Sequence, residues 1–312
     1  MGAAKYKHIF GPVASRRLGR SLGVDLLPFK TCTLDCVYCE CGRTTTLTKE
    51  RRDFFSPEEV LAELKDWKEK GNEADIVTLA GSGEPLLALS LEKIIRGIKE
   101  TTGLPCCLIT NATLFSDPAA RKAALLADVV MPSLDAADEA TFKKINRPVN
   151  GLSFAEYLEG LQLFCEEYRG KGRVDLEIFL VPGINDNEAQ VQALSLLSRS
   201  LRVNAVQLNT AVRPPADKDV RPIPREEMEK WARYFIPKAE VIASYHSAPL
   251  KEAKAVSEEE ILETLSHRVM SLEDLVEAKG YKKEDTEAIL RRLMEKGLIY
   301  SRTQDGKDFF YV

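Results

Sequence analysis

The chain has 312 residues, of which 44% are hydrophobic and 29% charged, and its formal net charge at pH 7 is −4. This composition is that of a globular protein long enough for one large domain and a small one. The sequence has no run of about 18 apolar residues and no apolar signal core near Met1. It therefore excludes a membrane span, and we expect the protein to stay in the cytoplasm.

Residues 1–20 read as an N-terminal extension, and the first part of the chain is basic. Residues 1–52 hold ten Lys or Arg against four acidic residues. Arg16 and Arg17, in Ser-Arg-Arg-Leu-Gly, could bind an anionic substrate group through bidentate contacts. They could equally be solvated or pair with acidic residues of the following domain.

Residues 21–245 alternate short apolar runs with longer amphipathic segments, which is typical of strand–helix units that build a parallel sheet. The predicted strands are six, with a possible short seventh: Leu22–Leu27, Asp75–Ala80, Cys106–Thr110, Asp128–Ser133, Val174–Val181, Ala205–Asn209 and Glu240–Ala243. Helix starts lie between them, at Ser56-Pro57 and at Asn187.

After the first predicted strand, Cys32, Cys36 and Cys39 form a CxxxCxxC array with Tyr38 before the last cysteine. Three closely spaced thiolates can hold three irons of a cubane iron–sulfur cluster and leave the fourth iron open to a ligand. Cys41 adds a fourth thiol, so a closed tetrahedral zinc site is the alternative. Structural zinc sites usually use two cysteine pairs separated by a longer spacer, which favours the cluster and makes Cys41 a neighbour.

The other three cysteines lie in apolar runs. An odd number of cysteines, with three of them clustered, fits a reducing compartment better than a disulfide framework. We therefore expect the remaining thiols to be buried in the core as small hydrophobic groups. They are Cys106, Cys107 and Cys165.

Polar residues follow the predicted strands where their carboxyl ends would present them to a ligand. The second strand runs into Gly81-Ser82-Gly83-Glu84, whose glycines let the backbone approach a ligand closely. The later candidates are Asn111, Ser133, Asp135, Arg147, Asn209 and Arg213. A Ser or Asp at a strand end can also be only a helix cap.

Residues 246–255 read as a linker, and residues 256–312 as a small winged-helix-like domain. Its predicted helices are Ser257–Ser266, Ser271–Lys279 and Lys283–Lys296, and its strands are Gly297–Ser301 and Asp308–Val312 with a turn at 304–306. This segment holds nine Lys or Arg against thirteen acidic residues. The acidic balance favours protein docking or substrate covering over nucleic-acid binding.

The cysteine array with Tyr38, followed by Gly81-Ser82-Gly83-Glu84 after the next strand, resembles the signature of the radical S-adenosylmethionine (SAM) superfamily. The resemblance implies an α/β fold with a TIM-barrel-like partial (β/α)6 barrel, and a [4Fe–4S] cluster on Cys32, Cys36 and Cys39. SAM would bind the open iron, and one electron would split it into methionine and a 5'-deoxyadenosyl radical that takes hydrogen from a substrate. The implied SAM contacts are Tyr38, Gly81, Ser82, Gly83, Glu84, Asn111, Ser133, Asp135 and Val181.

The subgroup motifs are Ser-Arg-Arg-Leu-Gly, Ser-Leu-Gly-Val-Asp and Glu-Cys-Gly-Arg-Thr from residue 40. They look like a subgroup of iron–sulfur oxidoreductases related to the tRNA wyosine-forming enzymes. The expected substrate is a modified tRNA base, a small anionic metabolite or a partner protein, and the electron donor a flavodoxin or ferredoxin. The candidate substrate residues are Arg16, Arg17, Arg147, Asn209 and Arg213.

A second hypothesis is an iron–sulfur redox-sensing regulator, or a protein-activating partner, that acts through the winged helix without SAM. It explains the C-terminal domain but leaves the glycine motif and the polar strand ends unexplained.

Overall fold

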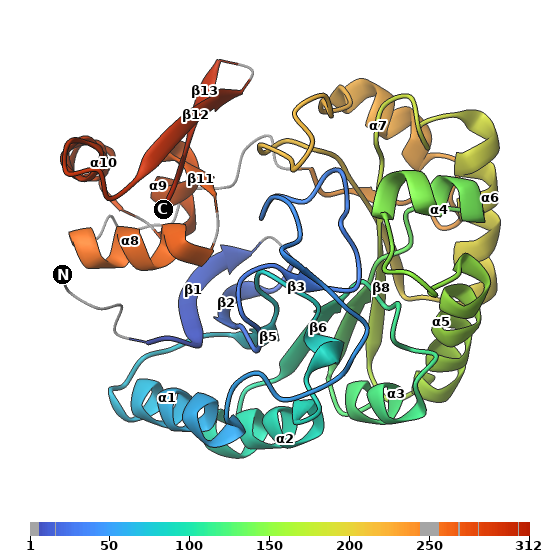
Figure 1. Ribbon diagram of the computed structural model, residues 1–312, viewed down its shortest axis with the longest axis horizontal. Coiled ribbons are helices and arrows are strands. Elements are labelled where there is room, and N and C mark those ends of the chain that lie inside the picture. The colour runs from blue at the N-terminus through green and yellow to red at the C-terminus, as the bar shows by residue number, and fades with distance from the viewer. Residues whose placement is uncertain (1–5, 16, 244–255, 268, 280, 305) are drawn as a thin grey trace.

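A computed structural model describes residues 6–15, 17–243, 256–267, 269–279, 281–304 and 306–312. Within these ranges the main feature is an eight-stranded sheet in the order β1-β2-β5-β6-β7-β8-β9-β10. All neighbours in it are parallel except the antiparallel pair β1 and β2 (Figure 1). The strands are β1 Ile9–Ser15, β2 Gly19–Val24, β5 Ile76–Leu79, β6 Cys106–Thr110, β7 Val129–Pro132, β8 Arg173–Phe179, β9 Ala205–Asn209 and β10 Glu240–Val241.

Helices α1, α2, α3, α5 and α6 form an arc along the outer face of this sheet (Figure 1). The helices are α1 Pro57–Glu69, η1 Pro85–Leu87, α2 Leu91–Thr102, α3 Pro118–Ala124, α4 Glu139–Asn146, α5 Phe154–Tyr168, α6 Glu188–Leu201 and α7 Arg225–Ala232. The predicted caps are confirmed, because the side chains of Ser56 and Asn187 accept backbone N–H bonds at the starts of α1 and α6. Apolar side chains from the helices and the strands form one large core.

The predicted parallel strands, including the short one at β10, are confirmed. Strand β1 was not predicted, and β2 begins at Gly19, inside the predicted N-terminal extension. The pairing of β1 with β2 shifts register between Phe10 and Val13, around Gly11 with its φ of +103°. A bulge of this kind breaks the alternation of apolar and polar residues by which a strand is recognised.

The second unit, residues 256–312, is called the C-terminal module below. Its elements are α8 Glu258–His267, β11 Met270–Ser271, α9 Leu272–Lys279, α10 Lys283–Glu295, β12 Tyr300–Gln304 and β13 Lys307–Tyr311. The strands form an antiparallel sheet in the order β11-β13-β12. Its own small core includes Ile261, Leu275, Leu290 and Leu293. The three predicted helices are confirmed, whereas β11 was not predicted and β12 begins three residues later than expected.

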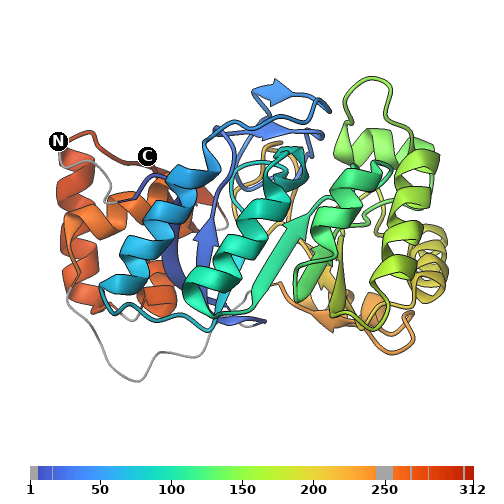
Figure 2. The same ribbon diagram turned by 90° about the horizontal axis from the view of Figure 1, so that it is seen from below.

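The C-terminal module packs against β1 through α8 and α9 (Figure 1). It also contacts the segment after β9, because Arg302 donates to the carbonyl of Pro214 at 2.6 Å and Gln304 to that of Ala211 at 3.3 Å. The view from below shows the module at one end of the molecule, beside α1 (Figure 2). The module therefore contacts both the first strand of the sheet and the segment that follows β9.

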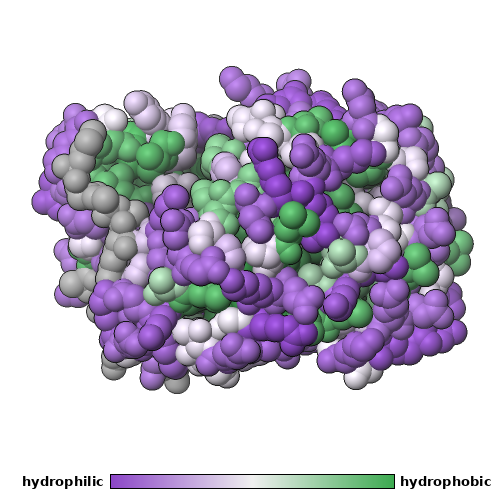
Figure 3. Space-filling view, turned by 60° about the horizontal axis from the view of Figure 1, so that its bottom comes forward, coloured by the Kyte–Doolittle hydropathy of each residue, from purple (hydrophilic) through white to green (hydrophobic). Residues whose placement is uncertain are grey.

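The surface shown in Figure 3 is mostly hydrophilic, with hydrophobic residues gathered in small patches. In the described ranges, no helix has both the length and the apolar character needed to cross a bilayer.

Candidate functional site

The three clustered cysteines lie in one loop, residues 30–48, which we call the cysteine loop. Its two short strands, β3 Thr31–Cys32 and β4 Thr46–Leu47, pair with each other. Backbone bonds tie the loop to the end of α4, from Asp35 N to the carbonyl of Asn146 at 3.0 Å and from Val37 N to that of Ile145 at 2.9 Å. The loop is therefore held in place before any ligand binds.

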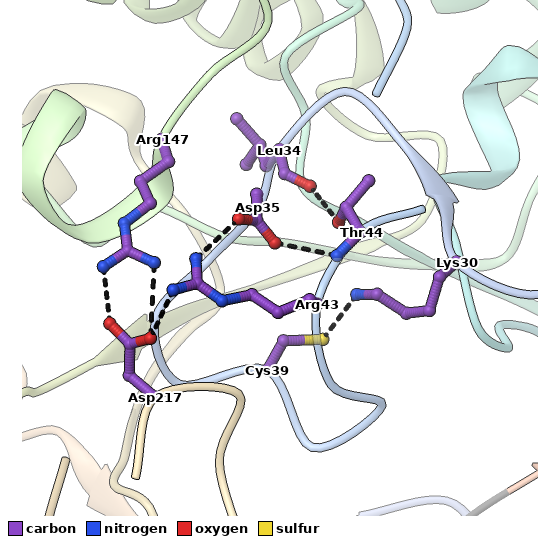
Figure 4. Close-up of polar contacts among 8 residues, drawn as sticks. All are labelled: Lys30, Leu34, Asp35, Cys39, Arg43, Thr44, Arg147 and Asp217. Carbon is purple, nitrogen blue, oxygen red and sulfur yellow. Dashed lines mark hydrogen bonds and ion pairs between the residues drawn. The ribbon is translucent and has the colours of Figure 1, made fainter. Parts of the chain in front are cut away.

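Each of the three candidate ligand sulfurs accepts a side-chain N–H from a different part of the chain. The pairs are Lys30 Nζ with Cys39 Sγ at 3.0 Å, Asn111 Nδ2 with Cys32 Sγ at 3.4 Å, and Asn146 Nδ2 with Cys36 Sγ at 3.4 Å. Figure 4 shows the first of them. Donors of this kind stabilise negative charge on sulfur and are typical of the surroundings of iron–sulfur centres.

The cysteine thiols differ in acidity. The neighbouring Cys41 thiol and the Lys30 ammonium lower the pKa of Cys39 to about 6. Burial raises the pKa of Cys32 to about 12 and that of Cys36 well above its ordinary value. A coordinated metal deprotonates a thiol outright, so metal binding would override the raised pKa of these two thiols.

The donor set fits an iron–sulfur cluster better than zinc. Within the described parts of the chain, no group of three or more His, Cys, Asp and Glu side chains is gathered to hold a metal ion. A cubane cluster spaces its cysteines around several irons, whereas a structural zinc site draws four ligands onto one ion. Cys32, Cys36 and Cys39 are all free and half-buried, and three N–H donors face their sulfurs. These residues fit the expected cluster.

The glycine turn that follows β5 packs directly against the start of the cysteine loop. A Cβ on Gly83 would lie 2.0 Å from the carbonyl oxygen of Thr31, and one on Gly81 would lie 2.1 Å from the carboxyl carbon of Asp25. Ser82 donates to Asp25 through its backbone N at 2.9 Å and through its hydroxyl at 3.0 Å. The close approach explains why glycine is needed at both positions.

Glu84 is buried beside the turn and orients Asn111. Its carboxylate accepts the Thr110 hydroxyl at 2.6 Å, the Leu86 N–H at 3.0 Å and the Asn111 N–H at 2.7 Å. Burial raises the pKa of Glu84 to about 7, although the three hydrogen bonds oppose this. Glu84 thus fixes the backbone of the residue that contacts Cys32.

Asp135 is a second buried carboxyl group, located after β7. It accepts the Tyr38 hydroxyl at 2.5 Å, the Asn146 amide at 2.8 Å and the Phe179 backbone N–H at 2.8 Å. The Tyr38 ring stacks on Phe179 with centroids 3.8 Å apart and an interplanar angle of 8°. Burial raises the pKa of Asp135 to about 6. Val181 is buried in the same apolar cluster.

The structure brings most of the predicted SAM contacts to the cysteine loop, but it places them in contact with other residues of the chain. Tyr38, Ser82, Glu84, Asn111 and Asp135 make the bonds given above. Ser133 lies on the neighbouring backbone, where its carbonyl accepts the Tyr157 hydroxyl.

Two predicted substrate residues, Arg17 and Asn209, contact the same carboxylate, that of Glu177. Arg17 Nη1 donates to Glu177 Oε2 and to Gln207 Oε1, both at 2.7 Å, and Asn209 Nδ2 donates to Glu177 Oε1 at 3.2 Å. The guanidinium of Arg17 therefore already has a carboxylate partner. Arg16 lies outside the described residues.

Arg147 lies at the end of α4 and forms part of a bridge between loops (Figure 4). It pairs with Asp217, which lies after β9. Arg43 of the cysteine loop donates to Asp217 at 2.7 Å and to Asp35 at 2.8 Å. These ion pairs join the cysteine loop to two other segments.

Arg213 is buried between two carboxylates. It pairs with Glu40 of the cysteine loop at 3.0 Å and with Asp274 of the C-terminal module at 3.4 Å. The last predicted substrate residue thus connects the module to the cysteine loop.

The sequence interpretation missed Lys30, Asn146, Glu177 and Asp217 as site residues. Two of them carried a signal. Lys30 is a lone cation two positions before the first cysteine, and Glu177 is a charged residue inside an apolar strand. The other two, Asn146 and Asp217, are polar residue types that usually lie on protein surfaces, and their role depends on contacts with segments distant in the sequence.

Two sequence profiles match parts of the chain. Residues 26–193 match the radical SAM superfamily. Residues 253–308 match a family described as Sulfolobus plasmid regulatory protein.

The chain is also similar to known proteins and to solved structures. The chain is 33% identical over 305 residues to a "GTPase Obg" of Brachyspira hyodysenteriae, covering 97% of this chain but only 45% of that protein. It is 31% identical over 308 residues to a UPF0026 protein of Methanocaldococcus jannaschii, covering 96% of this chain and 94% of that one. A solved structure of TYW1 with a lysine-pyruvate adduct bound shares the fold, with a TM-score of 0.52 at 18% identity over 70% of this chain and 74% of that one. The chain belongs to the radical SAM superfamily and, within it, to the UPF0026 proteins.

Proposed function

We propose that the chain is a radical SAM enzyme whose cluster is held by Cys32, Cys36 and Cys39. The cofactors of this superfamily are a [4Fe–4S] cluster and SAM. When bound, they supply a one-electron reductive cleavage of SAM to a 5'-deoxyadenosyl radical that abstracts hydrogen from a substrate. The observation that carries the proposal is the separate N–H donor at each of the three sulfurs.

In this proposal the polypeptide contributes a preorganised frame. The glycine turn at residues 81–83 packs against Asp25 and Thr31, which holds its backbone next to the cysteine loop, where the methionine part of SAM would bind. Ser133 and Asp135 follow β7, where they can contact the ribose, and Tyr38 lies in the cysteine loop beside Asp135. Val181, in the segment after β8, is the apolar residue proposed to pack against adenine. Asn111 lies between the turn and Cys32, within reach of both.

The sheet and its helices form the partial (β/α)6 barrel in this proposal, with residues 21–245 as the catalytic domain. The C-terminal module has the element order of a winged helix, with one helix, a strand, two helices and a two-stranded hairpin. Its Asp274 approaches the cysteine loop through Arg213. This position supports a role in covering the site or docking a partner.

The substrate is a small anionic metabolite or a modified tRNA base, and the charge pairs count more strongly against the tRNA. Arg17, Arg147 and Arg213 each have a carboxylate partner, so an anionic substrate would compete with internal carboxylates. A polyanion such as tRNA would need an unpaired basic surface. The electron comes from a flavodoxin-like or ferredoxin-like donor.

The direct test is anaerobic reconstitution with iron and sulfide, reduction with dithionite and addition of SAM. The proposal expects 5'-deoxyadenosine and methionine from the wild-type protein and none from Cys36→Ala. If the wild-type protein carries a reduced cluster and forms no more 5'-deoxyadenosine than Cys36→Ala, the enzyme proposal is wrong.

A redox-sensing regulator is the second candidate, and one contact favours it. Arg213 joins Glu40 of the cysteine loop to Asp274 of the C-terminal module, and the module matches a regulatory-protein profile. A structural change in the cysteine loop on oxidation of the cluster would then be transmitted to the module through Arg213. This candidate expects a change in protease cleavage of the module on oxidation of the cluster, with no SAM cleavage.

A further inference from the structure

The three N–H donors at the cysteine sulfurs point to a role beyond holding the loop. We propose that Lys30, assisted by Asn111 and Asn146, is a positioning residue that raises the reduction potential of the cluster. The inference rests on the proposed function above, since it requires a cluster on Cys32, Cys36 and Cys39. Reduction adds one negative charge to a cluster, and nearby donors and cations stabilise the reduced state more than the oxidised one.

Lys30 is placed to have the largest effect of the three. It is 2% exposed, and its ammonium donates to Cys39 Sγ at 3.0 Å. A full charge at this distance in a poorly solvated site acts far more strongly than a surface charge screened by water. The neutral amides of Asn111 and Asn146 act through their dipoles and should each have a smaller effect.

The contacts of Lys30 indicate that the negative charge that balances its buried ammonium lies on sulfur. Within the described residues no carboxylate forms an ion pair with Lys30, whose ammonium donates instead to Cys39 Sγ. Burying an ammonium without a partner anion is costly. An anionic iron–sulfur centre supplies that partner.

The position of Lys30 is fixed by its backbone. The backbone φ of Lys30 is +55°, a conformation that residues other than glycine adopt rarely. Its carbonyl accepts the N–H groups of Thr45 and Thr46, both at 3.1 Å. The returning strand of the cysteine loop therefore fixes the residue from which the ammonium extends to Cys39.

The two amides are held just as firmly. Asn111 Nδ2 also donates to Thr33 Oγ1 at 2.8 Å, and its Oδ1 accepts the Thr113 hydroxyl at 2.7 Å. Asn146 Nδ2 donates to Asp135 at 2.8 Å as well as to its sulfur. Each donor is anchored by a second bond, so the electrostatic field at the cluster is preorganised.

The test is an EPR-monitored redox titration of the reconstituted protein without SAM. Lys30→Met keeps the length of the side chain and removes its charge. We expect its midpoint potential to move to more negative values, with at least a tenfold lower ratio of reduced to oxidised cluster at a fixed potential, which corresponds to about 59 mV for one electron. Lys30→Arg should restore most of the shift, and Asn146→Leu should show a smaller shift of the same sign.

The matched control is Lys49→Met. Lys49 is an exposed lysine just beyond the cysteine loop that donates to the Gly151 carbonyl, and its loss should leave the potential unchanged because solvent and salt screen it. If Lys30→Met loads iron like the wild type and keeps its potential, the inference is overturned.

If Lys30→Met fails to load iron, Lys30→Gln and Asn111→Ser are titrated in its place. An unchanged potential in both would likewise overturn the inference. Its failure is separate from that of the proposed function, because a wild-type protein that cleaves SAM can still show no dependence of potential on Lys30.

Discussion

Two groups of cysteines in this chain differ in the surroundings of their sulfurs. Cys106, Cys107 and Cys165 are buried in the core, as predicted from the sequence. Burial alone raises the pKa of Cys165 to about 12, and in the described residues no side-chain N–H is directed at these thiols. The sulfurs of Cys32, Cys36 and Cys39 are also poorly solvated, but each accepts a side-chain N–H. The two groups therefore differ in their N–H donors as well as in burial, since these three residues are half-buried and the core cysteines are buried.

The largest expected effect comes from removing one sulfur of each group. Cys36→Ala should lose the cluster, because two remaining sulfurs cannot hold three irons. Cys165→Ala should keep the full iron content and lose only about 1 kcal/mol of stability. Iron and sulfide analysis of the reconstituted proteins measures this. Equal iron content in the two variants would contradict the assignment of the loop cysteines, and not the core cysteines, to the cluster.

The second prediction concerns the backbone that carries the loop. Gly83→Ala should destabilise the fold by about 2–3 kcal/mol, because its Cβ would overlap the Thr31 carbonyl at 2.0 Å. Gly42→Ala is the matched variant in the loop itself. Its φ is +83° with no atom within 4 Å of the added Cβ, so only about 1 kcal/mol of backbone strain is expected. Urea unfolding followed by circular dichroism compares the two.

The third prediction uses the buried carboxyl group that orients Asn111. The pKa of Glu84 is about 7 in the folded chain and about 4.3 when unfolded. Between these values the folded state binds more protons, so its stability falls as pH rises and then levels off above about pH 7. The loss from pH 5 to pH 8 should be on the order of 2 kcal/mol.

Glu84→Gln should remove that part of the pH dependence in urea titrations of the metal-free protein. Asp135, with its pKa of about 6, contributes in the same direction and remains in the variant. A variant with the same slope as the wild type would show that Glu84 is not protonated in this range.

The smallest effect is expected at Tyr38. Tyr38→Phe removes the hydroxyl that Asp135 accepts at 2.5 Å but leaves the ring stacked on Phe179. The loss should be about 1 kcal/mol, the usual net value of one hydrogen bond, with normal iron loading. Thermal unfolding gives the stability change, and a loss of iron would mean that Tyr38 positions the loop more strongly than its hydrogen bond suggests.

Local patterns were sufficient to predict the parallel strands of the sheet and to identify the candidate ligand cysteines. The parallel strands are continuous apolar runs, and the CxxxCxxC spacing is a local signature. Strand β1 was not predicted because Gly11 and the adjacent bulge interrupt its alternation. The hydrophobic periodicity of a segment indicates whether that segment is a strand, but it does not indicate which strand it pairs with.

The partners of the charged site residues could not be predicted from the sequence. Arg17 was proposed as a substrate residue, and its contact with Glu177 joins residues 160 positions apart. The contact of Arg213 with Glu40 joins residues 173 positions apart. Sequence periodicity identifies the face on which a residue lies, but such long-range ion pairs follow only from the packed structure.

The bridge from Arg43 to Asp217 has a consequence for the order in which the protein matures. These residues are 174 positions apart, and the contacts of the cysteine loop with Asp217 and Arg213 cannot form until most of the chain has left the ribosome. Contacts of such long range form late in folding. We therefore expect iron delivery to the cysteines to follow synthesis rather than accompany it, since the nascent N-terminal part would present them on a loop that is not yet closed.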